Sequence, residues 1–162
     1  MDNKSLEQQF IGMIRKNERI IYKVCSFYIS DELPIEDLYQ EVICNLWSAY
    51  PKFKSESSES TWIYRIALNT CMSGIRRGKR KLKKISLSIL HEAIAEPENI
   101  NEQIREMYAL IHRLKTLEKA IVLLWLEDKS YQEIADITGL TVSNVATKLK
   151  RSKEKLREMS NR

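Results

Sequence analysis

Residues 130–157 constrain the fold most strongly, because they read as two short helices joined by a tight turn. Ser130 precedes the first helix and Glu133 follows three residues later, which is the spacing of a capping box. Gly139 can adopt the left-handed conformation that ends this helix, and Thr141 can cap the next one. The segment therefore predicts a helix-turn-helix.

The second helix of this pair has two contrasting sides. Four residues at spacings of four, three and four predict one buried stripe: Val145, Leu149, Ser152 and Leu156. The opposite side carries hydrogen-bonding tips and positive charge: Asn144, Thr147, Lys148, Arg151 and Lys155. No acid interrupts that side before Glu154. The pattern favours a recognition helix in a DNA major groove, although many amphipathic helices have a basic outer face that is merely solvated.

The composition indicates an all-α chain with two separate basic regions. A length of 162 residues suits one domain or two small ones, and with 4 glycines and 3 prolines no stretch shows sustained strand alternation. Residues 76–84 contain only basic charges, and residues 129–162 are also net basic, whereas residues 85–128 are net acidic. This distribution suggests two contacts with a polyanion within a net charge of +5.

Helical periodicity recurs along the chain, interrupted by polar segments. The sequence predicts one or two helices within 6–28, then helices at about 34–49, 61–76, 104–114 and 117–126, before the pair in 130–157. Pro34 suits the first turn of its helix, Pro51 ends that helix, and the serine-rich segment 52–60 reads as a loop. Residues 85–101 lose the periodicity and read as a flexible linker with a short helical turn around 89–95.

No pattern of reactive or metal-binding residues stands out. Cys25, Cys44 and Cys71 are far apart and have no ligand spacing with His91 or His112, so they read as buried thiols rather than a zinc site. We expect neither a catalytic residue nor a cofactor. The sequence also shows no signal peptide and no membrane-spanning apolar run, which predicts a cytoplasmic protein.

Two motif blocks in order resemble a known family. The first block is DLYQEVICNLW followed, after a polar loop, by TWIYRIALNTCMSGIRRGKRK. The second block, after a linker, is LEKAIVLLWLEDKSYQEIADITGLTVSNVATKLKRSKEKLRE. Together they resemble a bacterial RNA polymerase sigma factor of the short, two-domain extracytoplasmic-function (ECF) type. The resemblance covers nearly the whole chain, and the presence of both blocks makes it specific.

The resemblance implies two small helical domains, 1–84 and 102–162, joined by the linker 85–101. The first domain would dock on the clamp helices of the polymerase largest subunit through Asp37, Gln40, Glu41 and Asn45. From spacing alone, this helix face would instead be read as solvated. The first domain would also capture the −10 promoter element, with one base turned out into the loop 53–60 and aromatic side chains able to stack. The residues implied for the −10 element and the DNA backbone are Phe53, Lys54, Ser57, Trp62, Arg65, Asn69, Arg76, Arg77 and Arg80. The second domain would bind the −35 element through Ser143, Asn144, Thr147, Lys148, Lys150, Arg151 and Lys155.

The implied partners are core RNA polymerase (clamp helices and flap) and promoter DNA. The sequence leaves open whether an anti-sigma factor binds as well. Three departures from the family pattern concern the −35 element: Ala146 and Lys148 stand where arginine is common, and Asp128 where glycine is frequent. Two rival hypotheses are a stand-alone DNA-binding regulator and a recombinase, but the sequence shows neither a clear sensor pocket or dimer seam nor the strands of an α/β catalytic domain.

Overall fold

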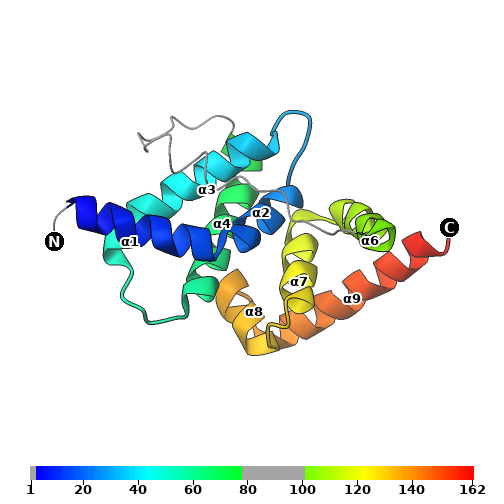
Figure 1. Ribbon diagram of the computed structural model, residues 1–162. Coiled ribbons are helices and arrows are strands. Elements are labelled where there is room, and N and C mark those ends of the chain that lie inside the picture. The colour runs from blue at the N-terminus through cyan, green and yellow to red at the C-terminus, as the bar shows by residue number, and fades with distance from the viewer. Residues whose placement is uncertain (1–2, 78–100) are drawn as a thin grey trace. The chain divides into compact units, whose positions relative to one another are not determined.

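The chain folds into two compact helical units, Met1–Pro97 and Glu98–Arg162, called unit 1 and unit 2 below. The computed structural model describes residues 3–77 and 101–162, and every regular element within those ranges is a helix (Figure 1). The predicted all-α class is confirmed. The basic residues after 77 and the linker segment 85–100, with its predicted helical turn, lie outside the described residues.

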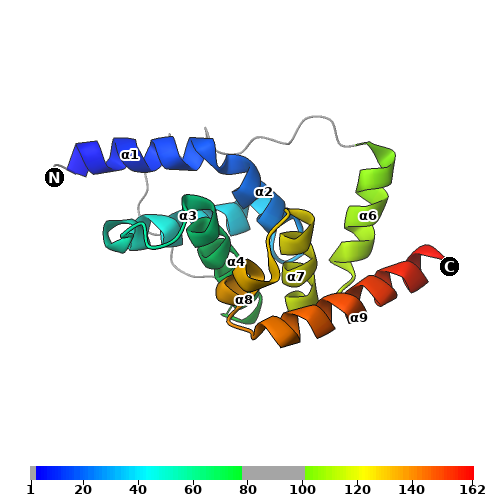
Figure 2. The same cartoon turned by 90° about the horizontal axis from the view of Figure 1, so that it is seen from below.

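The described part of unit 1, residues 3–77, contains four α-helices and one short 3₁₀ turn. They are α1 (Asn3–Lys16), α2 (Glu18–Ser26), α3 (Ile35–Ala49), the 3₁₀ turn η1 (Tyr50–Lys52) and α4 (Glu59–Arg77). Helix α4 packs against both α2 and α3 (Figures 1 and 2). The predicted boundaries shift slightly: Pro34 is the N-cap residue of α3 rather than part of its first turn, Pro51 lies inside η1, and α4 begins at Glu59.

The core of unit 1 is apolar and rich in aromatic rings. Leu38, Val42 and Leu46, the predicted stripe of α3, are all buried, as is Ile63 of α4. A chain of ring contacts then crosses the unit: Phe10 lies 5.0 Å from Trp47 and 5.3 Å from Tyr50, measured between centroids. This cluster joins α1 to the end of α3 and to η1, just before the loop that leads into α4.

The three cysteines are free and buried, as predicted. A hydrogen bond between the thiols of Cys25 and Cys71, together with burial, raises the pKa of Cys25 well above its usual value. A protonated thiol is a poor metal ligand, which agrees with a packing role for this pair.

Unit 2 contains α6 (Glu102–His112), α7 (Thr116–Leu126), α8 (Tyr131–Thr138) and α9 (Val142–Ser160). The apolar helix α7 supplies the core with five consecutive buried residues, Ala120 to Leu124. Both α8 and α9 pack on α7 and on each other (Figures 1 and 2). Val145, Leu149 and Ser152 are buried as predicted, whereas Leu156 is only half-buried.

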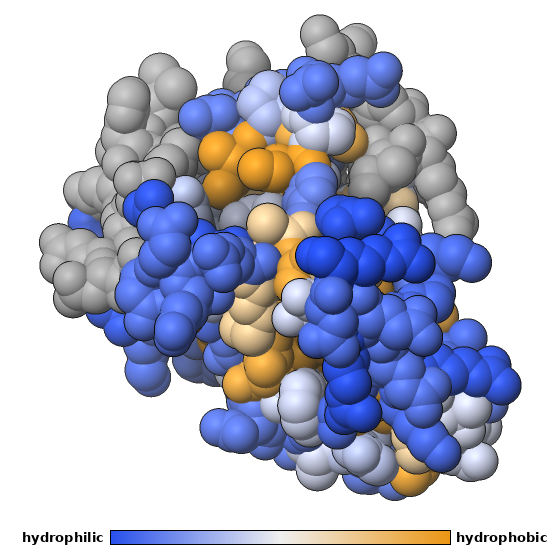
Figure 3. Space-filling view, turned by 90° about the vertical axis from the view of Figure 1, so that its right-hand side faces the viewer, coloured by the Kyte–Doolittle hydropathy of each residue, from blue (hydrophilic) through white to orange (hydrophobic). Residues whose placement is uncertain are grey.

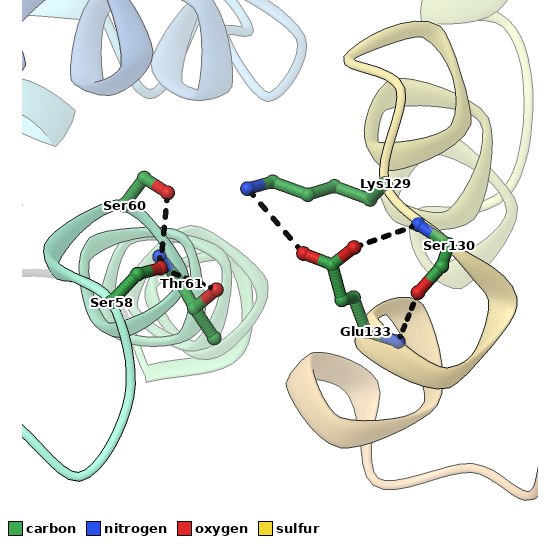
Figure 4. Close-up of polar contacts among 6 residues, drawn as sticks. All are labelled: Ser58, Ser60, Thr61, Lys129, Ser130 and Glu133. Carbon is green, nitrogen blue, oxygen red and sulfur yellow. Dashed lines mark hydrogen bonds and ion pairs between the residues drawn. The ribbon is translucent and has the colours of Figure 1, made fainter.

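The turn between α8 and α9 forms through the predicted local signals. Ser130 Oγ accepts a hydrogen bond from the Glu133 N–H (3.1 Å), and the Glu133 carboxylate accepts one from the Ser130 N–H (3.1 Å; Figure 4). These bonds lower the pKa of Glu133. Gly139 ends α8 with φ of 79°, and the Thr141 hydroxyl caps α9 by accepting from the Asn144 N–H (3.1 Å). The helix-turn-helix is confirmed.

Candidate nucleic-acid interface

The first turns of α9 present an exposed polar and basic face. Of the predicted residues only Lys148 is half-buried, and those that lie exposed are Ser143, Asn144, Thr147, Lys150, Arg151 and Lys155. The face is held in place from behind by Val145 and Leu149, which are buried against the rest of unit 2. Because the Thr141 cap satisfies one N–H at the start of α9, this end of the helix is well formed and can carry side chains to a DNA groove.

Two of the predicted lysines of α9 lie at the edge of this face. Lys148 is half-buried, and the Lys155 ammonium is bound to Glu118 of α7 at 2.7 Å. At 100° per residue both lysines lie beside the apolar stripe of α9. The sequence prediction had placed them opposite that stripe. Burial would raise the pKa of Glu118, but hydrogen bonds from Lys155 and from the Lys115 N–H outweigh it and lower that pKa.

A further lysine of α9 has a partner that the sequence did not indicate. The Lys153 ammonium lies 4.0 Å from the ring centroid of Trp125, which is 38 % exposed at the end of α7. Such a cation–π contact joins residues 28 positions apart, so no local spacing could reveal it. Nearby, Asp128 adopts φ of 60°, the left-handed conformation for which glycine is frequent at this position in the resembled family.

In unit 1 the predicted DNA loop is fixed by aromatic stacking. Phe53 stacks on Trp62 of α4 with centroids 4.5 Å apart and an angle of 30° between the planes, and Tyr50 lies 6.3 Å from the same ring. Trp62 is only 9 % exposed. The ring of Trp62 is therefore largely covered by protein and packs against Phe53 at the start of the loop, while its implied part in −10 recognition stays a prediction.

The other end of the loop is fixed by a helix cap that the sequence prediction missed. Ser58 Oγ accepts from the Thr61 N–H (3.1 Å) and donates to the Thr61 hydroxyl (2.9 Å), at the start of α4 (Figure 4). A serine just before an acidic first turn is a recognisable cap signal, so the sequence could have predicted this cap. Between these two anchors Lys54 and Ser55 are exposed, Ser57 is half-buried, and Ser55 has φ of 58°.

Along α4 the predicted contact residues differ in accessibility. Asn69 is exposed and Arg65 is half-buried. Arg76 and Arg77 belong to the last turn of α4, although only their backbone is described, and Arg80 lies outside the described residues.

The predicted docking face of α3 is partly accessible. Asp37 is exposed, while Gln40 and Glu41 are half-buried. Asn45 has a different environment: its Nδ2 donates to Thr70 Oγ1 of α4 at 2.8 Å. The Asn45 amide is therefore engaged with α4, and its implied part in polymerase docking stays a prediction.

The described residues bear on two kinds of site, a metal centre and a groove in unit 2. Within residues 3–77 and 101–162, no group of three or more potential ligands is placed to hold a metal ion. A groove of about 290 Å³ in unit 2 is lined by charged groups such as Arg113, Lys115 and Glu158, over Leu114 and Met159. The face in Figure 3 is mainly hydrophilic with smaller hydrophobic patches. Among the described helices, none has the length and apolarity needed to cross a membrane.

Comparison with known proteins supports the same two-part organisation. Residues 13–81 match the family model for sigma-70 region 2, and residues 104–156 match the model for sigma-70 region 4. The ECF RNA polymerase sigma-E factor of Haemophilus influenzae is 31 % identical over 74 % of this chain and 71 % of its own length. Its namesake from Escherichia coli K12 is 27 % identical over 88 % of this chain and 81 % of its own length.

Solved structures agree in fold. The sigma factor RpoE from Bartonella quintana, in complex with the anti-sigma factor NepR, superposes with a TM-score of 0.69, 16 % identity and 98 % coverage of both chains. CnrH, in complex with the cytosolic domain of CnrY, gives a TM-score of 0.60 with 20 % identity over 98 % of this chain and 97 % of CnrH. The described residues contain no β-strand, so they show no part of the α/β catalytic domain that a recombinase would need. The chain belongs to the sigma-70 family, in the ECF group of sigma factors, which are non-catalytic and direct promoter-specific transcription initiation.

Proposed function

We propose that this chain directs core RNA polymerase to promoters through three surfaces, one on α3, one at the start of α4 and one on α9. The observation that carries the proposal furthest is the exposed face of α9, where Arg151 and its polar neighbours lie free of acidic groups over two turns. Phosphate contacts set the position of such a helix, and contacts to base edges set its sequence preference.

The α9 surface is assigned to the −35 element. Ser143, Asn144 and Thr147 can reach base edges, and Arg151 can bind guanine through two parallel hydrogen bonds. Lys150 is exposed and suits a phosphate contact. Lys155 is left out, because it is bound to Glu118.

The α4 surface is assigned to the −10 element. The loop from Phe53 to Ser58 is anchored at one end by the Phe53–Trp62 stack and at the other by the Ser58 cap. Anchored ends hold the intervening backbone in place, which favours selection of one base turned out of the open strand. Asn69 and Arg65 lie farther along α4 and would contact the same strand, and Arg76, Arg77 and Arg80 would meet the DNA backbone.

The α3 surface is assigned to the polymerase. Asp37, Gln40 and Glu41 give it an acidic, hydrogen-bonding character that suits a basic docking site. Because RNA polymerase and its promoters lie in the cytoplasm, we place the protein there. RpoE is in complex with the anti-sigma factor NepR, and CnrH is in complex with the cytosolic domain of CnrY. We extend such control to this chain, with an anti-sigma factor that covers one of the three surfaces.

Reconstitution with core polymerase tests the proposal. The full chain mixed with core enzyme should start transcripts at defined promoters, mapped by sequencing of their 5′ ends, whereas core enzyme alone should not. Reversal of Asp37 and Glu41 to lysine should weaken binding to core polymerase while helix content, followed by circular dichroism, stays unchanged. Wild-type affinity of this double variant would remove α3 as the docking surface.

A further inference from the structure

One hydrogen bond joins the helix assigned to polymerase docking to the helix assigned to −10 capture. Asn45 Nδ2 on α3 donates to Thr70 Oγ1 on α4 at 2.8 Å, across 25 residues of sequence. The same Thr70 hydroxyl donates to the Ile66 carbonyl oxygen one turn earlier at 2.7 Å. The hydroxyl is therefore used in both directions, as donor within α4 and as acceptor from α3.

The acceptor is held in a fixed position. Thr70 is only 7 % exposed, and its bond to Ile66 selects one side-chain rotamer, so that a lone pair points toward α3. Asn45 therefore meets a preformed partner. A bond of this kind sets the relative rotation and translation of two helices more narrowly than apolar packing does, because its strength depends on angle as well as distance.

The two ends of the bond lie beside the two functional surfaces. Asp37, Glu41 and Asn45 are spaced by four residues and form one row along α3. On α4, Thr70 directly follows the exposed Asn69, and α4 is one continuous helix from Glu59, beside the loop, to Arg77. Because α4 is one continuous helix, a displacement of this row of α3 would be transmitted through the bond to α4 as a whole.

We propose that the Asn45–Thr70 hydrogen bond is a positioning contact that couples polymerase docking on α3 to −10 capture by α4. Asn45 acts through Thr70 and touches neither polymerase nor DNA. This inference rests on the proposed function and adds a route by which core polymerase binding prepares the DNA-binding surface. Thermodynamic reciprocity then requires that −10 DNA strengthen polymerase binding by the same factor.

Three substitutions isolate the bond. Asn45→Leu removes the donor at similar volume, Thr70→Val removes the hydroxyl at nearly unchanged shape, and Thr70→Ser keeps the hydroxyl. Ser26→Ala serves as the control, because it removes a side-chain bond of similar length, 2.7 Å to the Lys23 carbonyl oxygen, that stays within one segment of the chain. The full chains are compared for affinity to core polymerase and for open-complex formation at a promoter that the wild type uses.

Asn45→Leu and Thr70→Val should each lower open-complex formation by about twofold to tenfold, the ratio expected for one ordinary hydrogen bond. The Asn45→Leu/Thr70→Val double variant should be no worse than either single one. Thr70→Ser and Ser26→Ala should behave as wild type, and affinity for core polymerase without DNA should not change. In both impaired variants, a single-stranded −10 oligonucleotide should strengthen polymerase binding less than it does in wild type.

Other results would overturn the inference. Unchanged opening in both single variants, or losses that multiply in the double variant, would show that the bond carries no coupling. A parallel loss of core affinity in Asn45→Leu would return Asn45 to the docking surface itself. A wild-type chain that neither binds core polymerase nor starts transcripts would overturn the proposed function as well, which separates the two failures.

Discussion

The two units position their proposed DNA-binding elements through different kinds of contact. In unit 2 the helix-turn-helix is defined by contacts between residues three or four positions apart: Ser130 with Glu133, Thr141 with Asn144, and the left-handed Gly139 between them. In unit 1 the loop proposed for the −10 element has one local cap, Ser58 with Thr61, but its other end depends on ring contacts that run from Phe10 through Tyr50 to Trp62. The boundaries of the first can be read from sequence, whereas the roles of side chains in the second depend on their tertiary partners.

The largest expected effect concerns the long-range core of unit 1. Phe10→Ala should destabilise that unit by about 3–5 kcal/mol, because it empties a fully buried site between Trp47 and Tyr50. Urea unfolding followed by tryptophan fluorescence in a Trp125→Phe background reports unit 1 alone. Ile29→Ala, at a 37 % exposed position of the same unit, is the control and should cost far less. Equal losses would mean that the aromatic cluster does not organise unit 1.

Two glycines should respond with opposite sign. Gly139→Ala should destabilise unit 2 by about 1–2 kcal/mol, because its φ of 79° disfavours a Cβ even though the surrounding space is open. Gly12→Ala also meets open space but lies in the helical conformation of α1, so it should stabilise unit 1 by about 0.5–1 kcal/mol. Unfolding free energies of both variants give the signs, and a shared sign would contradict the assigned backbone conformations.

The caps offer a matched pair across the two units. Ser130→Ala and Ser58→Ala each remove a hydroxyl that accepts an N–H bond at a helix start, and each should cost about 1 kcal/mol. Their functional effects should differ. Ser58→Ala should loosen the −10 loop and broaden the preference at −10 positions, while Ser130→Ala should leave that preference unchanged. A randomised −10 library read by transcript sequencing makes the distinction.

The smallest effect is a pH dependence in unit 2. Because the pKa of Glu118 is lowered on folding, its contribution is present above the unfolded value of about 4.5 and is lost as pH falls through the folded value. Glu118→Gln should remove this part of the acid sensitivity, by about 1 kcal/mol or less for a partly exposed pair. Unfolding free energies at pH 7 and pH 3.5 test this, and an unchanged pH dependence in Glu118→Gln would assign the effect to other groups.

The same contrast explains what the sequence could and could not predict. The all-α class, the helix-turn-helix and the buried stripe through Val145 and Leu149 follow from periodicity and caps. The partners of Lys155 and Asn45 lie 37 and 25 residues away, so spacing on one helix could not reveal that Glu118 and Thr70 occupy them. The ring partners of Trp62 could not be predicted for the same reason, since its aromatic character was visible but the packing of Phe53 and Tyr50 against it was not.

We propose that α9 and the loop before α4 recognise the two promoter elements independently. The Arg151→Ala variant tests this claim most directly. Holoenzymes reconstituted with the wild-type or the variant chain initiate on a library with both promoter elements randomised, at several salt concentrations. Arg151→Ala should lose about 1–3 kcal/mol of discrimination at −35 positions while the −10 preference stays intact. Lys155→Ala should leave −35 selectivity nearly unchanged, because the ammonium that it removes is bound to Glu118. An equal loss of initiation on all sequences with Arg151→Ala, or a shift of both preferences together, would contradict the account.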